Sequence, residues 1–207
     1  MRKDSHLRYP LDRLFSRASH MAILRVLQDN REGMSGRAIA REAGINHQAC
    51  ALALRHLEGL GLLQRQGQGR TQLIRFNFDN YLVKELILPL LKKERDFQDH
   101  MRQDIAKSFK DKALAITVFG SVARGQDIPG SDIDVLIVSE GSHKNQVLEK
   151  ATGYSAEFKR KYGLRLSPVV MTPAEARKRV ESSEPLFKNI LSEGVDLLPH
   201  KLHEVLR

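Results

Sequence analysis

The stretch from Val118 to Val138, VFGSVARGQDIPGSDIDVLIV, constrains the fold more than any other part of the chain. An apolar run ends at Gly120-Ser121 and a second begins at Ile133, and both have the length and composition of short buried strands. Asp132 and Asp134 stand at the start of the second run, and residues two apart on a strand point to the same face. Adjacent like charges repel unless a cation lies between them, and paired oxygen ligands suit Mg²⁺. The stretch therefore predicts a cation site at the end of a strand.

The composition is that of a soluble globular protein with one or two domains. The 207 residues are 41% hydrophobic, and no run approaches the roughly 18 apolar residues that a membrane span needs. The first ten residues are polar and basic, without the apolar core of a secretory signal. The single cysteine, Cys50, excludes an intrachain disulfide and fits a reducing compartment. The expected location is the cytoplasm, with no membrane partner.

Basic residues are concentrated in the N-terminal half. The net charge is +9; residues 1–95 hold 17 Lys and Arg against 9 Asp and Glu, whereas the remainder holds 17 against 16. A basic segment joined to a nearly neutral one predicts a polyanion-binding module followed by a domain with another task. The alternative is a solvated surface that only keeps the protein in solution.

Three helices and a hairpin are predicted in this basic half. Apolar residues at helical spacing indicate a helix from His20 to Gln28. Ser35 and Asn46 are suitable N-caps for two further helices, which end at Gly44 and near Leu60 with helix-turn-helix spacing between them. A glycine-bearing connection then joins two candidate strands, as in a hairpin. The strands are Leu62–Gln66 and Thr71–Phe76, joined by Gly67 to Arg70.

The string SGRAIAREAGINHQACALALRHLEGLGLLQRQGQGRTQLIRF resembles the winged helix-turn-helix family of DNA-binding domains, and the resemblance covers about residues 11–78. It implies a domain over residues 1–80 that places its third helix in the major groove of double-stranded DNA and its hairpin wing on the backbone. Carried over to this chain, it assigns DNA contacts to His47, Gln48, Arg55, Arg65 and Arg70. Arginines of this kind mainly contact phosphates, so base reading falls to Gln48, His47 and Arg55.

The middle of the third helix leaves a second use open. Ala49 to Leu54 is entirely small or apolar, so Ala51 or Leu52 must face outward in any phase. An outward small residue suits a thymine methyl group, whereas an outward leucine equally suits a protein contact. A winged helix used for dimerisation is therefore the alternative. The preferred phase buries Cys50, Ala53, Leu54 and Leu57.

A helical connecting arm is predicted over residues 81–111. Asp79 is a candidate cap for its first helix, and Pro89 should kink or interrupt that helix. Further along, an amphipathic stripe recurs every four residues. We expect the stripe to pack against the following domain; pairing with a second copy of the chain, as in a homodimer, is the alternative. Its members are Phe97, Met101, Ile105 and Phe109.

Strands and helices alternate over residues 112–207, which indicates a small mixed sheet covered by helices. The chain is therefore expected to be a two-domain α/β protein. The predicted strands are Ala113–Phe119, Ile133–Val138 and Leu164–Met171, with an edge strand at Val195–Leu198. The predicted helices are a short one at Val122–Arg124, then Asn145–Tyr162, Pro173–Val180 and Leu186–Leu191.

Gly120-Ser121, ten further residues and Asp132-Ile133-Asp134 form the GS-x10-D-x-D pattern of the DNA polymerase beta nucleotidyltransferase superfamily. The fuller strings GSVARG and SDIDVLIV are similar to its small stand-alone members, the minimal nucleotidyltransferases, over about residues 113–172. The resemblance implies that Gly120 and Ser121 bind the triphosphate of an NTP, with ATP the expected nucleotide, and that Asp132 and Asp134 hold Mg²⁺. Ser131, at the start of SDID, is placed with the nucleotide-binding residues.

The residues themselves support part of that assignment. Gly120 lets the backbone approach a phosphate, and the start of the following helix offers free N–H groups to an anion. Arg124 is placed to add a charge-assisted contact to phosphate; a structural salt bridge to Asp127 or Asp132 is its alternative role. For the aspartate pair, the alternative is an N-cap or turn role.

The chain departs from the family pattern at the third strand. The family has a third carboxylate there, which helps hold a second metal and activates the attacking hydroxyl, whereas LRLSPVVM contains no Asp or Glu. Three hypotheses follow. The first is an enzyme that transfers a nucleoside monophosphate to a hydroxyl acceptor; the second is a non-catalytic, nucleotide-sensing transcriptional regulator; the third is an antitoxin-like protein that acts through a protein partner.

Overall fold

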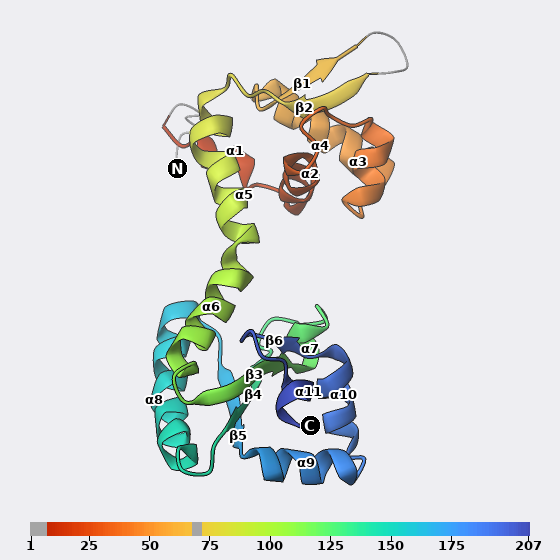
Figure 1. The fold of residues 1–207 in the computed structure, drawn as a ribbon. Coiled ribbons are helices and arrows are strands. Elements are labelled where there is room, and N and C mark those ends of the chain that lie inside the picture. Colours follow the sequence, from red (N-terminus) through yellow and green to blue (C-terminus); the bar gives the residue numbers. More distant parts are fainter. Residues whose placement is uncertain (1–7, 68–71) are drawn as a thin grey trace. The chain divides into compact units, whose positions relative to one another are not determined.

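A computed structural model describes residues 8–67 and 72–207, and the chain divides into two compact units after Asp96 (Figure 1). The predicted segment 81–111 is largely helical, as expected, but its first half belongs to one unit and its second half to the other. The predicted boundaries at residues 80 and 111 therefore differ from the division between the two units. Within the described residues, no helix is long and apolar enough to cross a membrane.

The first unit contains the predicted helices and hairpin. The Ser35 hydroxyl accepts a hydrogen bond from the Ala38 N–H at 3.3 Å, and the side-chain Oδ1 of Asn46 accepts one from the Ala49 N–H at 2.8 Å. Both predicted N-caps are therefore confirmed. The two hairpin strands are antiparallel, and Met34 forms an additional bridge to Ile74. This arrangement is a winged helix-turn-helix. Its elements are α1 (Pro10–Leu14), α2 (Ala18–Gln28), α3 (Gly36–Glu42), α4 (His47–Gly59), β1 (Leu63–Gln66) and β2 (Leu73–Phe76).

A π-helical turn, η2 (Val83–Ile87), and α5 (Leu88–Arg95) complete the core of this unit. Val83, Ile87 and Leu91 are almost fully buried in the same apolar cluster as residues of α2 and α4, and this burial stabilises the unit. Asn80, rather than the predicted Asp79, caps the helical segment, since its side-chain oxygen accepts hydrogen bonds from the N–H groups of residues 82 and 83. The helical stretch continues through the predicted break at Pro89, which lies directly after the π-helical turn, where the helical hydrogen-bond pattern changes.

The second unit is a four-stranded mixed sheet with helices on both faces. The strand order is β5-β4-β3-β6; β3 is antiparallel to β4 and β6, whereas β4 and β5 are parallel. Its strands are β3 (Ala113–Phe119), β4 (Ile133–Ser139), β5 (Leu166–Met171) and β6 (Val195–Asp196). Its helices are α6 (Phe97–Phe109), α7 (Gly120–Ala123), α8 (Lys144–Tyr162), α9 (Pro173–Glu181), α10 (Pro185–Glu193) and α11 (Leu202–Val205).

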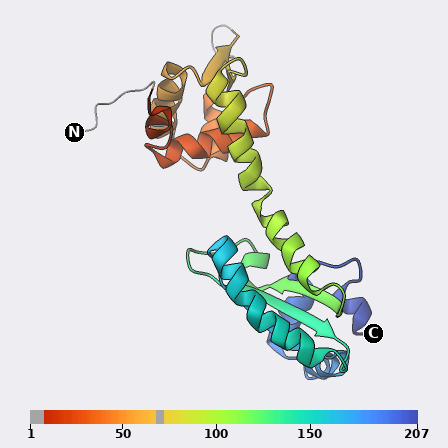
Figure 2. The same cartoon turned by 90° about the vertical axis from the view of Figure 1, so that its left-hand side faces the viewer.

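The two faces of the sheet are covered by different helices. α6 and α8 pack on one face, and Figure 2 views the unit with α8 in front of the strands. α9, α10 and α11 contribute buried apolar side chains to the other face. Met101, Ile105 and Phe109 of the predicted stripe are buried on the first face, so the stripe packs within the second unit as expected, whereas Phe97 is 43% exposed.

Candidate functional sites

Asp132 and Asp134 lie at the N-terminal end of β4, on the sheet face that α9, α10 and α11 cover. In the ladder Asp134 pairs with Phe119 of β3, which is buried on that face. Both aspartates are half-buried. Burial, followed by repulsion from the Asp132 carboxylate, raises the pKa of Asp134, while a hydrogen bond with Ser167 opposes the rise. The Asp132 carboxylate is thus close enough to destabilise the charge on Asp134, which a divalent cation would relieve.

Gly120 begins α7 directly after β3, beside these carboxylates. Its φ is +77°, a left-handed conformation that glycine adopts without strain. A Cβ atom at this position would lie 2.5 Å from Asp134 Oδ2, closer than van der Waals contact permits. The glycine is therefore required by the backbone turn and also by the carboxylate packed against it.

Ser167 on the neighbouring strand β5 and Arg165, which directly precedes that strand, face the two aspartates. The Arg165 Nε atom lies 2.7 Å from Asp132 Oδ1, and Ser167 is the ladder partner of Asp134. Ser167 thus lies level with the carboxylate pair, where the sequence lacks the expected third carboxylate. Among the described residues, no group of three or more Asp, Glu, His or Cys side chains could hold a metal ion. A pair of carboxylates still suits Mg²⁺, which usually completes its shell with water and substrate phosphate.

The other predicted nucleotide-binding residues have different surroundings. The Arg124 guanidinium donates to Glu193 Oε2 at 3.2 Å and to Gln126 Oε1 at 2.9 Å, so its ion-pair partner is neither Asp127 nor Asp132. The Ser131 hydroxyl accepts a hydrogen bond from the Ile128 N–H at 3.0 Å and closes the loop before β4. Ser121 is half-buried in α7, next to Gly120. Their contacts to a nucleotide stay a prediction.

In the first unit, a groove of about 1040 Å³ runs between α3, α4 and the hairpin. His47, Arg65 and Arg37 line it together with Ala51; Arg37 was not anticipated, although it stands in the first turn of α3. Arg65 also forms a 2.7 Å ion pair with Glu58. Gln48 and Arg55 are exposed on α4 outside the groove lining, and Arg70 lies outside the described residues. The groove therefore brings together part of the predicted DNA-binding set.

The helix phase predicted for α4 is confirmed. Its buried residues are Cys50, Ala53, Leu54 and Leu57. Ala51 is exposed, and Leu52 is 51% exposed beside it. An outward leucine on the helix that would enter DNA keeps both uses of this surface open, as expected from the sequence.

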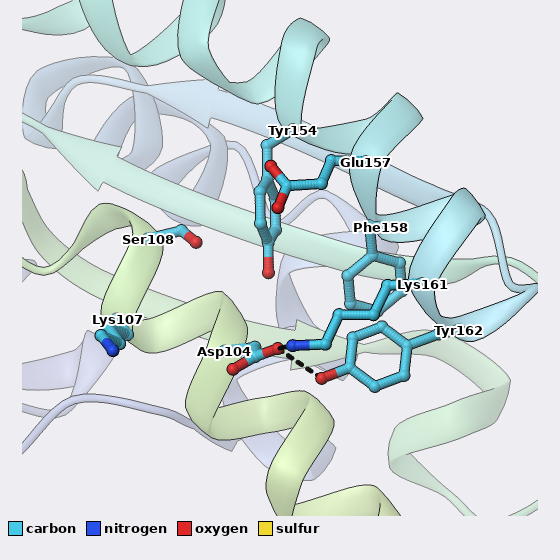
Figure 3. A pocket seen from close by; sticks show the side chains of 8 residues that line it. All are labelled: Asp104, Lys107, Ser108, Tyr154, Glu157, Phe158, Lys161 and Tyr162. Atoms are coloured by element: carbon cyan, nitrogen blue, oxygen red, sulfur yellow. Dashed lines mark hydrogen bonds and ion pairs between the residues drawn. The ribbon is translucent and has the colours of Figure 1, made fainter.

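A small polar pocket between α6 and α8 lies on the other face of the sheet from the aspartates (Figure 3). Its volume is about 150 Å³, and Figure 3 shows Lys161 and Tyr162 both directed at Asp104. Both donate to the Asp104 carboxylate, and these hydrogen bonds lower the pKa of Asp104. Because the Asp104 carboxylate already accepts these two hydrogen bonds, we interpret the cluster as a structural link that holds α6 against α8.

A glycine-containing turn after one strand, followed by paired carboxylates on the adjacent strand, defines the class of nucleotidyltransferase-fold proteins. A sequence model of the family described as "Nucleotidyltransferase domain" matches residues 102–195, which include the whole site around Gly120 and Asp134. The chain belongs to this family.

Two relatives from Methanocaldococcus jannaschii each bear the name "Putative protein adenylyltransferase". One is 29% identical over 96 residues, which are 45% of this chain and 64% of the relative. The other is 32% identical over 69 residues, which are 33% of this chain and 70% of the relative. A solution structure from Mycobacterium bovis, described as a homodimeric winged helix-turn-helix DNA-binding domain, has 18% identity and a TM-score of 0.34, covering 50% of this chain and 94% of that one. The first unit is described as a winged helix-turn-helix because of its own helices α2 to α4 and its β1–β2 hairpin.

Proposed function

We propose that the second unit binds a nucleoside triphosphate, with ATP the expected nucleotide, together with Mg²⁺ at Asp132 and Asp134. The observation that carries this proposal is the half-buried carboxylate pair packed against the left-handed turn at Gly120. When bound, Mg²⁺ supplies positive charge that offsets the charge on the transferring phosphate. Gly120 and Ser121 allow the chain to approach the triphosphate closely, and Arg124 adds a guanidinium at the rim.

The reaction proposed for this site is transfer of a nucleoside monophosphate to a hydroxyl acceptor. A bond forms between the acceptor oxygen and the α-phosphorus, the bond from the α-phosphorus to the oxygen that bridges it to the β-phosphate breaks, pyrophosphate leaves, and the hydroxyl proton is released to water. The names of the two relatives support a protein as the acceptor. Ser167 in the position level with Asp134 favours the second candidate, a nucleotide-sensing transcriptional regulator that binds without transfer.

We further propose that the first unit binds double-stranded DNA. The basic N-terminal half and the groove lined by His47, Arg37 and Arg65 support this role. His47, Gln48 and Arg55 would face base edges, while Arg65 and Arg70 would contact phosphates of the backbone. The exposed Leu52 supports the alternative of a protein partner or a homodimer through the same surface, as in an antitoxin-like protein.

The nucleotide proposal is tested by calorimetry on the full chain. Asp132→Asn with Asp134→Asn should abolish Mg²⁺-dependent ATP binding while the fold is retained, because both metal-binding charges are lost. Asp111→Asn, an exposed aspartate in the turn before β3, is the matched control and should bind as the wild type does. Unchanged affinity in the double variant contradicts the metal site. Incubation with α-labelled ATP, Mg²⁺ and cell extract then separates the enzyme, which labels a macromolecule, from the regulator, which does not.

The DNA proposal is tested by mobility shift with the full chain. Binding should weaken steeply as salt rises, because phosphate contacts release counterions. Arg55→Gln should weaken binding, whereas Arg160→Gln on α8 removes the same charge from the second unit and should have little effect. Absence of any shift at low salt, with a dimer seen by light scattering, would favour the protein-interaction alternative.

A further inference from the structure

The guanidinium of Arg165 sits on the carboxylate that the proposed function assigns to Mg²⁺. Arg165 directly precedes β5, and its carbonyl oxygen accepts a hydrogen bond of 2.8 Å from the Ile133 N–H, so its backbone is fixed beside the start of β4. From there its Nε atom reaches Asp132 Oδ1 at 2.7 Å. A guanidinium and a metal ion would compete for this oxygen atom.

The two partners of this ion pair have unequal freedom. Asp132 Oδ1 is buried and, apart from the ion pair, has no hydrogen-bond partner, whereas the Arg165 side chain is 64% exposed. An ion pair with one exposed partner contributes little to folding stability, so stability alone does not account for the arrangement. The buried carboxylate oxygen therefore depends on a cation, whereas most of the arginine side chain is in solvent.

We propose that Arg165 is a nucleotide-positioning residue that exchanges partners: it neutralises Asp132 in the free protein and moves to the triphosphate when an NTP arrives with Mg²⁺. This inference rests on the proposed nucleotide function of the same site. A planar guanidinium suits phosphate oxygens because it donates two parallel hydrogen bonds. The NTP with its Mg²⁺ brings a replacement cation for Asp132 and a new anion for Arg165. Neither the buried Asp132 Oδ1 nor the Arg165 guanidinium is then left without a partner.

The exchange also accounts for the departure of β5 from the family pattern. Ser167 of β5 stands level with Asp134, and Arg165 just before β5 reaches Asp132, so this segment supplies a hydroxyl and a cation where a third carboxylate is expected. The two carboxylates provide ligands for one divalent ion, and neither Arg165 nor Ser167 adds a carboxylate for a second. We therefore infer that each chain takes one divalent ion together with the NTP.

The test measures metal and nucleotide affinity separately. Mn²⁺ alone is titrated by electron paramagnetic resonance, and Mg²⁺–ATP is titrated by calorimetry, in wild type, Arg165→Gln and Arg165→Lys. Arg165→Gln should bind Mn²⁺ at least severalfold more tightly, because the competing cation is gone. It should bind Mg²⁺–ATP about tenfold or more weakly, because a charge-assisted phosphate contact is lost. Arg165→Lys keeps a competing charge but not the fork, so its Mn²⁺ affinity should stay near wild type while its Mg²⁺–ATP affinity falls.

Opposite changes in the two affinities support the exchange, since a merely structural role would move both the same way or neither. Arg160→Gln is the control for net charge and should change neither affinity by much. Equal or parallel changes in Arg165→Gln, or two Mn²⁺ ions per chain in the presence of nucleotide, would overturn the inference. If the wild type binds no Mg²⁺–ATP, or the Asp132 and Asp134 variants bind it normally, the proposed nucleotide function itself fails, which is a distinguishable result.

Discussion

The candidate functional side chains of the two units stand in opposite relation to their cores. His47, Gln48 and Arg55 project from the exposed face of α4. Asp132 and Asp134 lie at the end of a strand whose following residues are buried, where burial already raises the pKa of Asp134. Groups held in such surroundings oppose folding even while they serve a site. Substitutions on the exposed face of α4 and at the aspartate pair should therefore change the free energy of unfolding differently.

The largest difference is expected between two glycine substitutions. Gly120→Ala should lower the free energy of unfolding by about 2 kcal/mol, because the left-handed backbone and the close Asp134 Oδ2 atom both reject a Cβ. Gly59→Ala in the last turn of α4 meets no atom within 4 Å and should raise stability by up to about 1 kcal/mol. Denaturant unfolding of the full chain measures both. Equal effects would show that the turn at Gly120 is not strained by a side chain.

A smaller difference is expected when the charges themselves are removed. Asp134→Asn should raise the free energy of unfolding at neutral pH, because the folded state disfavours the ionised carboxylate and the amide is neutral and of the same shape. Arg55→Gln in the first unit should change stability by no more than about 0.5 kcal/mol, as an exposed residue away from the core. Thermal unfolding of both variants measures these effects. A lower stability for Asp134→Asn than for the wild type would contradict the expectation that the buried charge opposes folding.

Local rules account for what the sequence predicted correctly. The caps Ser35 and Asn46, the buried face of α4 and the strands that flank Gly120 follow from neighbours in sequence, and the structure confirms each. The two-residue period of a strand was enough to predict that Asp132 and Asp134 point to the same face of the sheet. Such features depend on few residues, which explains why they could be found without a structure.

Contacts between distant segments could not be predicted in this way. The partner of Arg124 is Glu193, which lies 69 residues further along the chain at the end of α10. Arg165 meets Asp132 only because β4 and β5 are parallel in one particular register. The extent of the first unit was underestimated for the same reason, since Ile87 and Leu91 join a core formed by much earlier helices.

A polar pair beneath α4 in the first unit contrasts with the exposed groups on that helix. His20 is fully buried; its Nδ1 atom lies 3.0 Å from the Leu14 carbonyl oxygen, and its Nε2 atom lies 3.2 Å from His56 Nδ1 on α4. Burial is the main cause that lowers the pKa of His56, and the charges of His20, Arg17 and Arg13 lower it further. Protonation of His56 beneath α4 is therefore opposed by the fold, whereas the candidate DNA-binding groups on α4 are exposed.

The smallest expected effect follows from this pair. The folded state resists protonation of His56, whereas the unfolded chain takes up a proton near the ordinary histidine pKa of about 6.5. The stability that neutral His56 contributes is thus present above that pH and is lost as the pH falls below it. His56→Asn should flatten the dependence of unfolding free energy on pH between about 7.5 and 5.5, whereas His200→Asn, an exposed histidine in the second unit, should leave it unchanged. Hydrogen exchange of amides in α4 measures the effect within the first unit. An unaltered pH dependence in His56→Asn would show that burial of His56 does not contribute to the pH dependence of the first unit.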